Sequence, residues 1–150
     1  MKRVIEIIDA RPLMPSAVHE LRTSSQREGL ANVAILVRDW NDATLRFDCA
    51  GETLLVARVE DVTIAVGGLR QCRDVPEALR ISRFYVAPAW RRRGVATTLA
   101  SEILRRSEEF TELVSCNAQA SPGAAPFWET LGFVPVNIEG VTHLRHAPAP

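Results

Sequence analysis

One segment of the sequence places positive charge at the start of an expected helix. An apolar strand ending at Val86 leads into a turn with Pro88, three arginines at 91–93 and Gly94, after which small residues open the helix. Residues 78–101 contain five arginines and no acidic residue. A helix start presents backbone N–H groups without intrahelical acceptors and the positive end of the helix dipole. Beside arginines, these groups predict a site for the phosphates of a cofactor.

The totals of the sequence favour one globular domain. With 150 residues, of which 47% are hydrophobic and 24% charged, the chain is long enough for a core without disulfide or metal staples. Eighteen basic and eighteen acidic side chains cancel, which argues against a protein that coats nucleic acid. We expect one domain over residues 1–146 and a disordered Ala-Pro-Ala-Pro tail over residues 147–150.

The cysteines and the apolar runs indicate a compartment and exclude some site classes. Cys49, Cys72 and Cys116 form no C-x-x-C pair, so we expect neither a disulfide framework nor a metal site, and Cys116 is interpreted as a packing thiol on a buried strand. The amino-terminal apolar run is broken by Glu6, and no segment approaches the ~18 apolar residues of a membrane span. We therefore expect a cytoplasmic protein that does not bind a membrane.

Hydrophobic periodicity predicts an α/β (α+β) domain with a mixed sheet. The apolar stripe of the helix that starts at Gly94 includes Leu99, Ile103 and Phe110 and is expected to face the core. Glu60 and Asp61 separate two strands and indicate a hairpin. The expected strands are 4–8, 53–59, 63–69, 79–86, 113–118, 133–136 and 141–146, and the other expected helices are 17–28, 33–40 and 124–131.

The strand at residues 79–86 changes its alternation phase. Leu79 and Ile81 follow one phase, whereas Phe84 and Val86 follow the other. An extra residue at Ser82–Arg83 would form a β-bulge and turn backbone N–H groups out of the ladder. The alternative is a strand buried on both faces, in which the phase carries little information. Gly67-Gly68, which lacks the further glycine of a dinucleotide-binding loop, is interpreted as a strand bend.

Two motifs in order resemble those of one enzyme family. Arg91-x-x-Gly94-x-Ala96, directly after Tyr-Val-x-Pro, resembles the acyl-CoA-binding signature of the GCN5-related N-acetyltransferases, the GNAT family. Further along, Ala124-x-x-Phe127-Trp128-x-x-x-Gly132-Phe133 resembles the second motif of that family. The resemblance covers residues 53–146 well and the first fifty in outline. It implies the GNAT-like acyl-CoA N-acyltransferase fold, with a mostly antiparallel sheet splayed between its fourth and fifth strands and helices on both faces.

The resemblance implies that acetyl-CoA lies in the gap between those strands. The pantetheine arm would bond to the backbone at Phe84 and Val86, and the pyrophosphate would sit on the N–H groups of residues 91–96. Gly94 lets the main chain approach a phosphate because it has no Cβ. Asn117 either bonds the arm or forms a turn. The expected cofactor contacts are Phe84, Val86, Arg91, Arg92, Arg93, Gly94, Val95, Ala96, Thr97, Asn117 and Phe127.

The reaction that the resemblance implies is direct attack of a neutral amine on the thioester. The backbone N–H of Val86 would be the oxyanion donor. Two positions depart from the family pattern, because Trp128 replaces the tyrosine that often protonates the thiolate and Arg80 replaces a frequent glutamate. Tyr85 is a possible replacement acid, or a packing residue. Glu77 is a possible base or amine-binding carboxylate, or a solvated loop residue.

The expected function is transfer of an acetyl group from acetyl-CoA to a primary amine of a small molecule or peptide. The acceptor pocket would be built by the first two helices, the loop at residues 74–77 and the last strands. A homodimer is expected by resemblance. The alternatives are an inactive CoA-binding module, which Trp128 and Arg80 suggest, and a nucleic-acid-binding domain that uses residues 80–93, which the zero net charge disfavours.

Overall fold

A seven-stranded mixed sheet forms the centre of the computed structural model, which describes residues 4–149. Its spatial order is β1-β2-β3-β4-β5-β7-β6. Neighbouring strands are antiparallel except for the β4–β5 pair, which is parallel. The strands are β1 (Glu6–Asp9), β2 (Thr53–Val59), β3 (Val62–Gln71), β4 (Leu79–Val86), β5 (Leu113–Cys116), β6 (Val134–Ile138) and β7 (Val141–His146).

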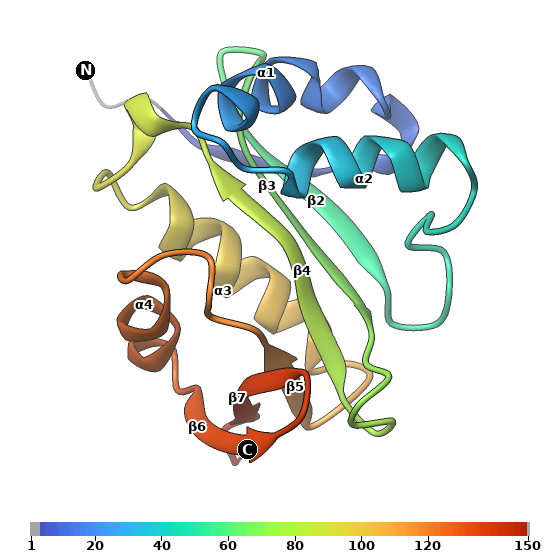
Figure 1. The fold of residues 1–150 in the computed structure, drawn as a ribbon, viewed down its shortest axis with the longest axis vertical. Helices are drawn as coiled ribbons and strands as arrows, with labels where there is room; N and C mark the ends of the chain where they lie inside the picture. The colour runs from blue at the N-terminus through green and yellow to red at the C-terminus, as the bar shows by residue number, and fades with distance from the viewer. Residues whose placement is uncertain (1–3, 150) are drawn as a thin grey trace.

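Helices cover both faces of the sheet (Figure 1). α1 (His19–Arg27) and α2 (Asn32–Asn41) pack on one face, and α3 (Val95–Ser107) and α4 (Ala124–Thr130) pack on the other. Each face has its own hydrophobic cluster, because successive side chains of a strand point to opposite faces. On β4, Tyr85 joins the cluster under α1 and α2, whereas Ile81 and Val86 join the cluster under α3.

The sheet opens between β4 and β5, as the sequence predicts. Only two residue pairs join these strands in the described chain, Leu79 with Val114 and Arg80 with Ser115. Beyond Arg80 the two strands diverge, and β4 continues along β3 without a partner on its other edge (Figure 1). The splay therefore leaves the rest of β4, residues 81–86, without strand pairing on that edge among the described residues.

The predicted β-bulge is confirmed in β4. Ser82 pairs with Gly68 and Tyr85 pairs with Val66, so Arg83 and Phe84 together face Gly67. Arg83 has φ +57°, in the left-handed region. A Cβ on Gly67 would lie 2.7 Å from the Phe84 ring, which explains why a glycine stands opposite the bulge. The change of phase is thus a backbone feature and not an effect of burial on both faces.

The end of α3 differs from the expectation. The helix ends at Ser107, whose buried hydroxyl donates to the Leu104 carbonyl at 2.6 Å. Phe110 lies beyond this end, in a turn, and is 61% exposed, so the prediction that it faces the core is wrong. Helical spacing predicts the face of a residue only as far as the helix continues.

Other boundaries shift by a few residues. The first strand begins at Glu6, and the expected helix at 17–28 begins with a 3-10 turn at Ser16–Val18 and becomes α1 at His19. The strand expected to reach residue 118 ends at Cys116, since the N–H of Ala118 donates instead to the Thr142 hydroxyl at 2.8 Å. The expected helices at 33–40 and 124–131 correspond to α2 and α4.

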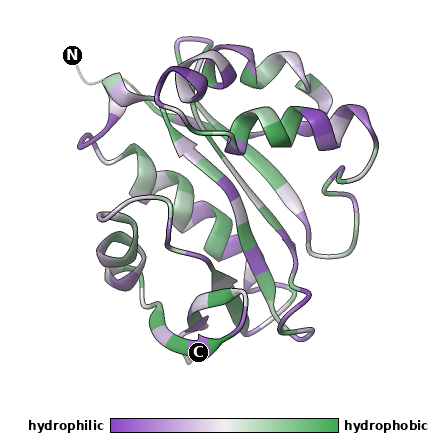
Figure 2. Cartoon of the chain, viewed as in Figure 1, coloured by the Kyte–Doolittle hydropathy of each residue, from purple (hydrophilic) through white to green (hydrophobic). Residues whose placement is uncertain are grey.

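The carboxyl end of the described chain remains tied to the sheet region at its first tail residue. The N–H of Ala147 donates to the Glu112 carbonyl at 2.7 Å, and Pro150, the last residue of the expected disordered tail, lies outside the described residues. Within residues 4–149, no helix has both the length and the apolarity needed to cross a membrane. Figure 2 shows hydrophilic positions between the hydrophobic ones along β4.

Candidate functional site

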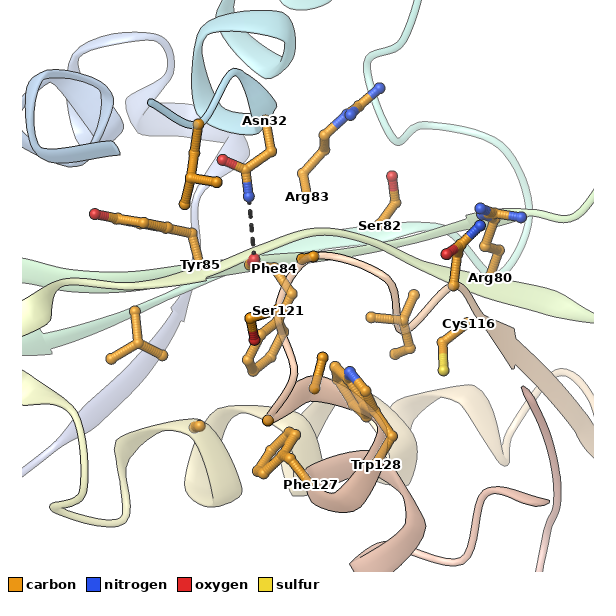
Figure 3. Close-up of a pocket in the computed structure, with 18 of the residues that line it drawn as sticks. Asn32, Arg80, Ser82, Arg83, Phe84, Tyr85, Cys116, Ser121, Phe127 and Trp128 are labelled. Atoms are coloured by element: carbon orange, nitrogen blue, oxygen red, sulfur yellow. Dashed lines mark hydrogen bonds between the residues drawn. The ribbon is translucent and has the colours of Figure 1, made fainter. Parts of the chain in front are cut away.

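The opening between β4 and β5 forms a cleft of about 1380 Å³. It is lined by β4, the segment between α1 and α2, the start of α3, the segment after β5, and α4 (Figure 3). Seven of the expected cofactor contacts line this cleft: Phe84, Val86, Arg91, Arg92, Ala96, Asn117 and Phe127. Four others, Arg93, Gly94, Val95 and Thr97, do not, and neither does the candidate base Glu77.

The backbone of β4 turns polar groups toward the open side. The N–H of Ala87 donates to the Ile64 carbonyl at 2.9 Å, so Ala87 faces β3. Because bonding direction alternates along an antiparallel strand, the N–H and C=O of Val86 face away from β3. Side chains already bond two of the outward carbonyls, that of Val86 through Arg91 Nε at 3.1 Å and that of Phe84 through Asn32 Nδ2 at 3.2 Å (Figure 3). The Val86 N–H therefore points away from β3, toward the open edge of the strand.

The three consecutive arginines have different surroundings. The Arg91 guanidinium binds both carboxylate oxygens of Glu28, at 2.6 and 2.7 Å, and this contact holds the pKa of Glu28 below its usual value. Arg93 lies over the Trp90 ring, 5.5 Å from its centroid. Arg92 lines the cleft and has neither a hydrogen bond nor an ion pair within residues 4–149. Of the three side chains, Arg92 is the one available to a ligand.

Gly94 forms the N-cap of α3 with φ +81°, a conformation that L side chains rarely adopt. A Cβ at this position would meet no atom within 4 Å, so the space beside it is open. The unpaired N–H groups of the first helical turn lie next to this open space. Val95 is buried in the core under α3, whereas Thr97 is exposed. The helix start thus offers backbone amides and little side-chain cover.

The two candidate proton-transfer residues are not brought together. Tyr85 is 4% exposed in the cluster under α1 and α2, and its hydroxyl donates to Glu28 at 2.5 Å and bonds Ser24 at 2.9 Å. Burial, followed by the hydrogen bond to Glu28, raises the pKa of Tyr85. Glu77 is exposed on the loop before β4, where its carbonyl accepts a bond from Thr111.

Aromatic rings form the wall of the cleft on the α4 side. Trp128 packs edge-on against Phe84 at 5.0 Å, Phe127 at 4.9 Å and Phe133 at 5.4 Å between ring centroids. Cys116 also lines the cleft, and burial raises the pKa of its thiol to about 12. A thiol held in this protonated form is a poor nucleophile, in line with the packing role that the sequence indicates.

Sequence reasoning missed several residues that line the cleft. Glu28 lies in the segment that joins α1 and α2, and Asn32 is the first residue of α2; they are 63 and 52 positions from Arg91 and Phe84, which they bind. No local pattern marks such pairs. The sequence does mark the position of Arg83, because the change of alternation phase predicts a bulge there. Arg70 and Arg73, at the end of β3 and in the following loop, also line the cleft without having been singled out.

Comparison with known proteins agrees with this geometry. Residues 21–147 match a family model described as the acetyltransferase (GNAT) domain, and the chain belongs to this family. No curated protein matches the sequence.

Solved structures share the fold over nearly the whole chain. A candidate acetyltransferase from Exiguobacterium sp. 255-15 is 24% identical, with a TM-score of 0.80, covering 97% of this chain and 94% of the other. PH1933 from Pyrococcus horikoshii OT3 is 18% identical, with a TM-score of 0.77 and coverage of 97% and 100%. YncA, a candidate acetyltransferase from Salmonella typhimurium solved with its cofactor acetyl-CoA, is 13% identical, with a TM-score of 0.72 and coverage of 97% and 95%.

Proposed function

We propose that this protein is an N-acetyltransferase that moves the acetyl group of acetyl-CoA to a primary amine by direct attack. One observation carries the proposal: the edge of β4 beyond Arg80 has no strand partner and continues toward the start of α3 at Gly94. An extended arm can bond such an edge as an added strand would, while a diphosphate binds helix N–H groups. Membership of the GNAT family supports this assignment.

Acetyl-CoA is the donor that the comparisons favour. YncA, which shares the fold, was solved with acetyl-CoA. In this chain the phosphates would meet the amides of residues 91–96 and the Arg92 side chain. The thioester would lie between Val86 and the aromatic wall formed by Phe84, Phe127 and Trp128.

The chemistry needs few side chains. The amine nitrogen forms a bond to the thioester carbon, the carbonyl oxygen becomes an oxyanion facing the Val86 N–H, and the C–S bond then breaks. The amine proton leaves to solvent, and CoA departs as a thiolate that water can protonate, because its thiol pKa of ~8.5 makes it a fair leaving group. Tyr85, whose raised pKa keeps it protonated, is the proposed acid if a side chain takes part.

A second candidate is a CoA-binding module without catalysis. Trp128 favours it, since an indole N–H donates a hydrogen bond but does not release its proton. Trp128 is also 6% exposed and held among three aromatic rings. This candidate shares the cofactor site and differs only in turnover.

Calorimetry with acetyl-CoA tests the cofactor site. The Gly94→Glu variant should weaken binding on the order of a hundredfold, because it puts a carboxylate where phosphates must approach the amides. Gly29→Glu is the matched control, since Gly29 has φ +76° and also has no neighbour within 4 Å of an added Cβ. Equal heats for wild type and Gly94→Glu, or no heat for either, would contradict the cofactor assignment.

Turnover separates the two candidates. Thiol release from acetyl-CoA is followed over polyamines, amino acids, aminoglycosides and peptide amino termini, and acetylated products are identified by mass. A transferase releases thiol in step with an acetylated amine. A binding module gives the calorimetric signal and no release with any amine.

A further inference from the structure

Four arginines gather at the end of the cleft that lies away from the expected phosphate site. Arg70, Arg73, Arg80 and Arg83 line this end, which we call the arginine end, and Asp74 is the carboxylate that lines it with them. Arg70 and Arg80 are paired residues on the neighbouring strands β3 and β4, so their side chains leave the same face of the sheet. In Figure 3 Arg80, Ser82 and Arg83 lie on the side of β4 that faces α2, opposite Phe127 and Trp128.

Arg80 is held in place by the rest of the protein. Its Nη1 donates to the Gly140 carbonyl at 2.9 Å and lies 3.8 Å from the Asp74 carboxylate. Asp74 in turn packs against Gly140, where an added Cβ would lie 2.7 Å from its Oδ2. Asp74 therefore pairs with Arg80, and its negative charge is not available to neutralise the other arginines of this end.

Arg83 is not satisfied in this way. Its Nε is buried and has no hydrogen-bond partner among the described residues. Burial lowers the pKa of Arg83, and the nearby positive charges of Arg70, Arg38 and Arg80 lower it further, whereas Asp39 opposes this. A donor withdrawn from water without an acceptor costs free energy, and more so when it is charged. Its backbone at φ +57° adds strain, and strain of this kind concentrates at ligand sites.

An anion would relieve this arrangement. The side chains of Arg70 and Arg83 have neither a hydrogen bond nor an ion pair within residues 4–149. Guanidinium groups bind carboxylate and phosphate through paired N–H donors, and such bonds are strong because both partners are charged.

We propose that the arginine end binds an anionic group, a carboxylate or a phosphate, carried by the acceptor amine. The proposal rests on the proposed transferase function. The bulge takes up one residue, so Arg83 and Val86 lie opposite Gly67 and Ala65, two residues apart on β3, or roughly 7 Å at ~3.3 Å per residue. A molecule that places its amine beside the Val86 N–H and its anion at Arg83 and Arg70 is therefore of amino-acid size or slightly longer.

Matched acceptors test this proposal. Amino acids are compared with their carboxamides, which have the same size and a less basic amine, so that only an anion site favours the acid. 2-Aminoethyl phosphate is compared with ethanolamine to separate phosphate from carboxylate. We expect kcat/KM to be at least about tenfold higher for an anionic member of a pair. Equal values within both pairs would overturn the proposal and leave the transferase function intact.

Variants then locate the site. Arg83→Gln, and independently Arg70→Gln, should reduce the preference for the anionic acceptor by about tenfold or more, leaving kcat/KM for the neutral acceptor and the affinity for acetyl-CoA unchanged. Arg38→Gln is the control for a mere change of net charge, because Arg38 contributes to the field at Arg83 but does not line the cleft. Weaker acetyl-CoA binding in Arg83→Gln, with the preference kept, would assign the arginine to the cofactor and overturn the proposal.

A readout without turnover keeps the two proposals separate. In ¹⁵N-labelled protein, titration with amino acid or 2-aminoethyl phosphate should shift an arginine Nε–H resonance that is missing in Arg83→Gln, whereas the carboxamide should not. If no amine is acetylated but this shift appears, the transferase function fails and the anion site stands. If amines are acetylated and no such shift appears with either anion, the anion site fails alone.

Discussion

Two arginines at opposite ends of the cleft, Arg91 and Arg83, have opposite surroundings. At the phosphate end, Arg91 is bound by both oxygens of Glu28 and also donates to the Val86 carbonyl. At the arginine end, the Arg83 Nε is buried without a hydrogen-bond partner among the described residues, and the charges of Arg70, Arg38 and Arg80 stand near it together with the opposing charge of Asp39.

This difference distinguishes an arginine that holds the structure in place from an arginine that is available to bind a ligand. A cation that the protein itself neutralises fixes the position of its neighbours, here the turn after β4 and the segment between α1 and α2. A half-buried cation left without a partner raises the free energy of the empty protein, and a ligand of opposite charge removes that cost. Arg91 therefore supports the structure, whereas Arg83 fits the binding role that we propose for it.

The largest expected effect concerns Cys116, which lines the cleft. With a pKa of about 12, the Cys116 thiol should react with iodoacetamide near pH 8 about a thousandfold more slowly than an ordinary thiol of pKa ~8.5. Mass spectrometry of the native and urea-unfolded protein measures this, with the exposed Cys49 as the internal reference. Rapid labelling of Cys116 in the folded protein would show that water reaches this thiol. The different surroundings of Arg91 and Arg83 would then need an explanation other than burial.

Two neighbouring arginines test the contrast directly. Arg92→Gln should weaken acetyl-CoA binding by about tenfold with an unchanged melting temperature, because its side chain faces the cleft without a partner. Arg91→Gln should instead lower the free energy of unfolding by about 1 kcal/mol, because it removes the paired bonds to Glu28. Calorimetry and urea unfolding of both variants give the two values. The reverse outcome would make Arg91 the recognition residue.

The Glu28 contact has a pH dependence of known sign. Its pKa in the folded protein lies below the ordinary 4.5, chiefly through the hydrogen bonds from Arg91. The stabilisation is therefore complete above pH ~4.5, where an unfolded glutamate is ionised, and is lost as the pH falls through the lower folded value. Urea unfolding between pH 7 and 3 should show Glu28→Gln less stable than wild type at pH 7, with the gap narrowing in acid. A constant gap would mean that packing, and not charge, is lost.

The smallest expected effect concerns an ion-pair cluster on the surface of α3. Glu102 accepts bonds from Arg105 and Arg106 on α3, which lower its pKa to about 2. Its contribution is full above its ordinary 4.5 and is lost toward pH 2. Since Arg105 is largely exposed, Glu102→Gln should cost only about 0.5 kcal/mol at pH 7. A cost as large as that of Glu28→Gln would remove the distinction between a surface pair and the Arg91 contact.

The sequence predicted those features that depend on neighbouring residues. The bulge follows from the alternation of eight residues in β4, and the start of α3 follows from Gly94 and the small residues after it. The splay came from the resemblance of two motifs and not from periodicity. Phe110 was misplaced because its spacing fits the helix, while the end of the helix depends on how the chain turns after Ser107.

Features that depend on distant contacts were beyond sequence reasoning. Arg91, Arg92 and Arg93 look equivalent in the sequence, and only the fold brings Glu28 to one of them and Trp90 to another. Likewise, only the fold shows that the Tyr85 hydroxyl donates to Glu28, 57 positions away. The unmet donor of Arg83 depends on what covers it, and an isolated strand pattern cannot show this.

The short seam between β4 and β5 has a consequence for cooperativity. Within residues 4–149, the pairs Leu79–Val114 and Arg80–Ser115 are the strand pairing between the two halves of the sheet. Most of the remaining contact between the halves is side-chain packing against α3. A molecule bound along the unpaired edge of β4 would supply the missing backbone hydrogen bonds and couple the two halves of the sheet. Neither half must keep strand register with the other over more than these two residue pairs in the described chain.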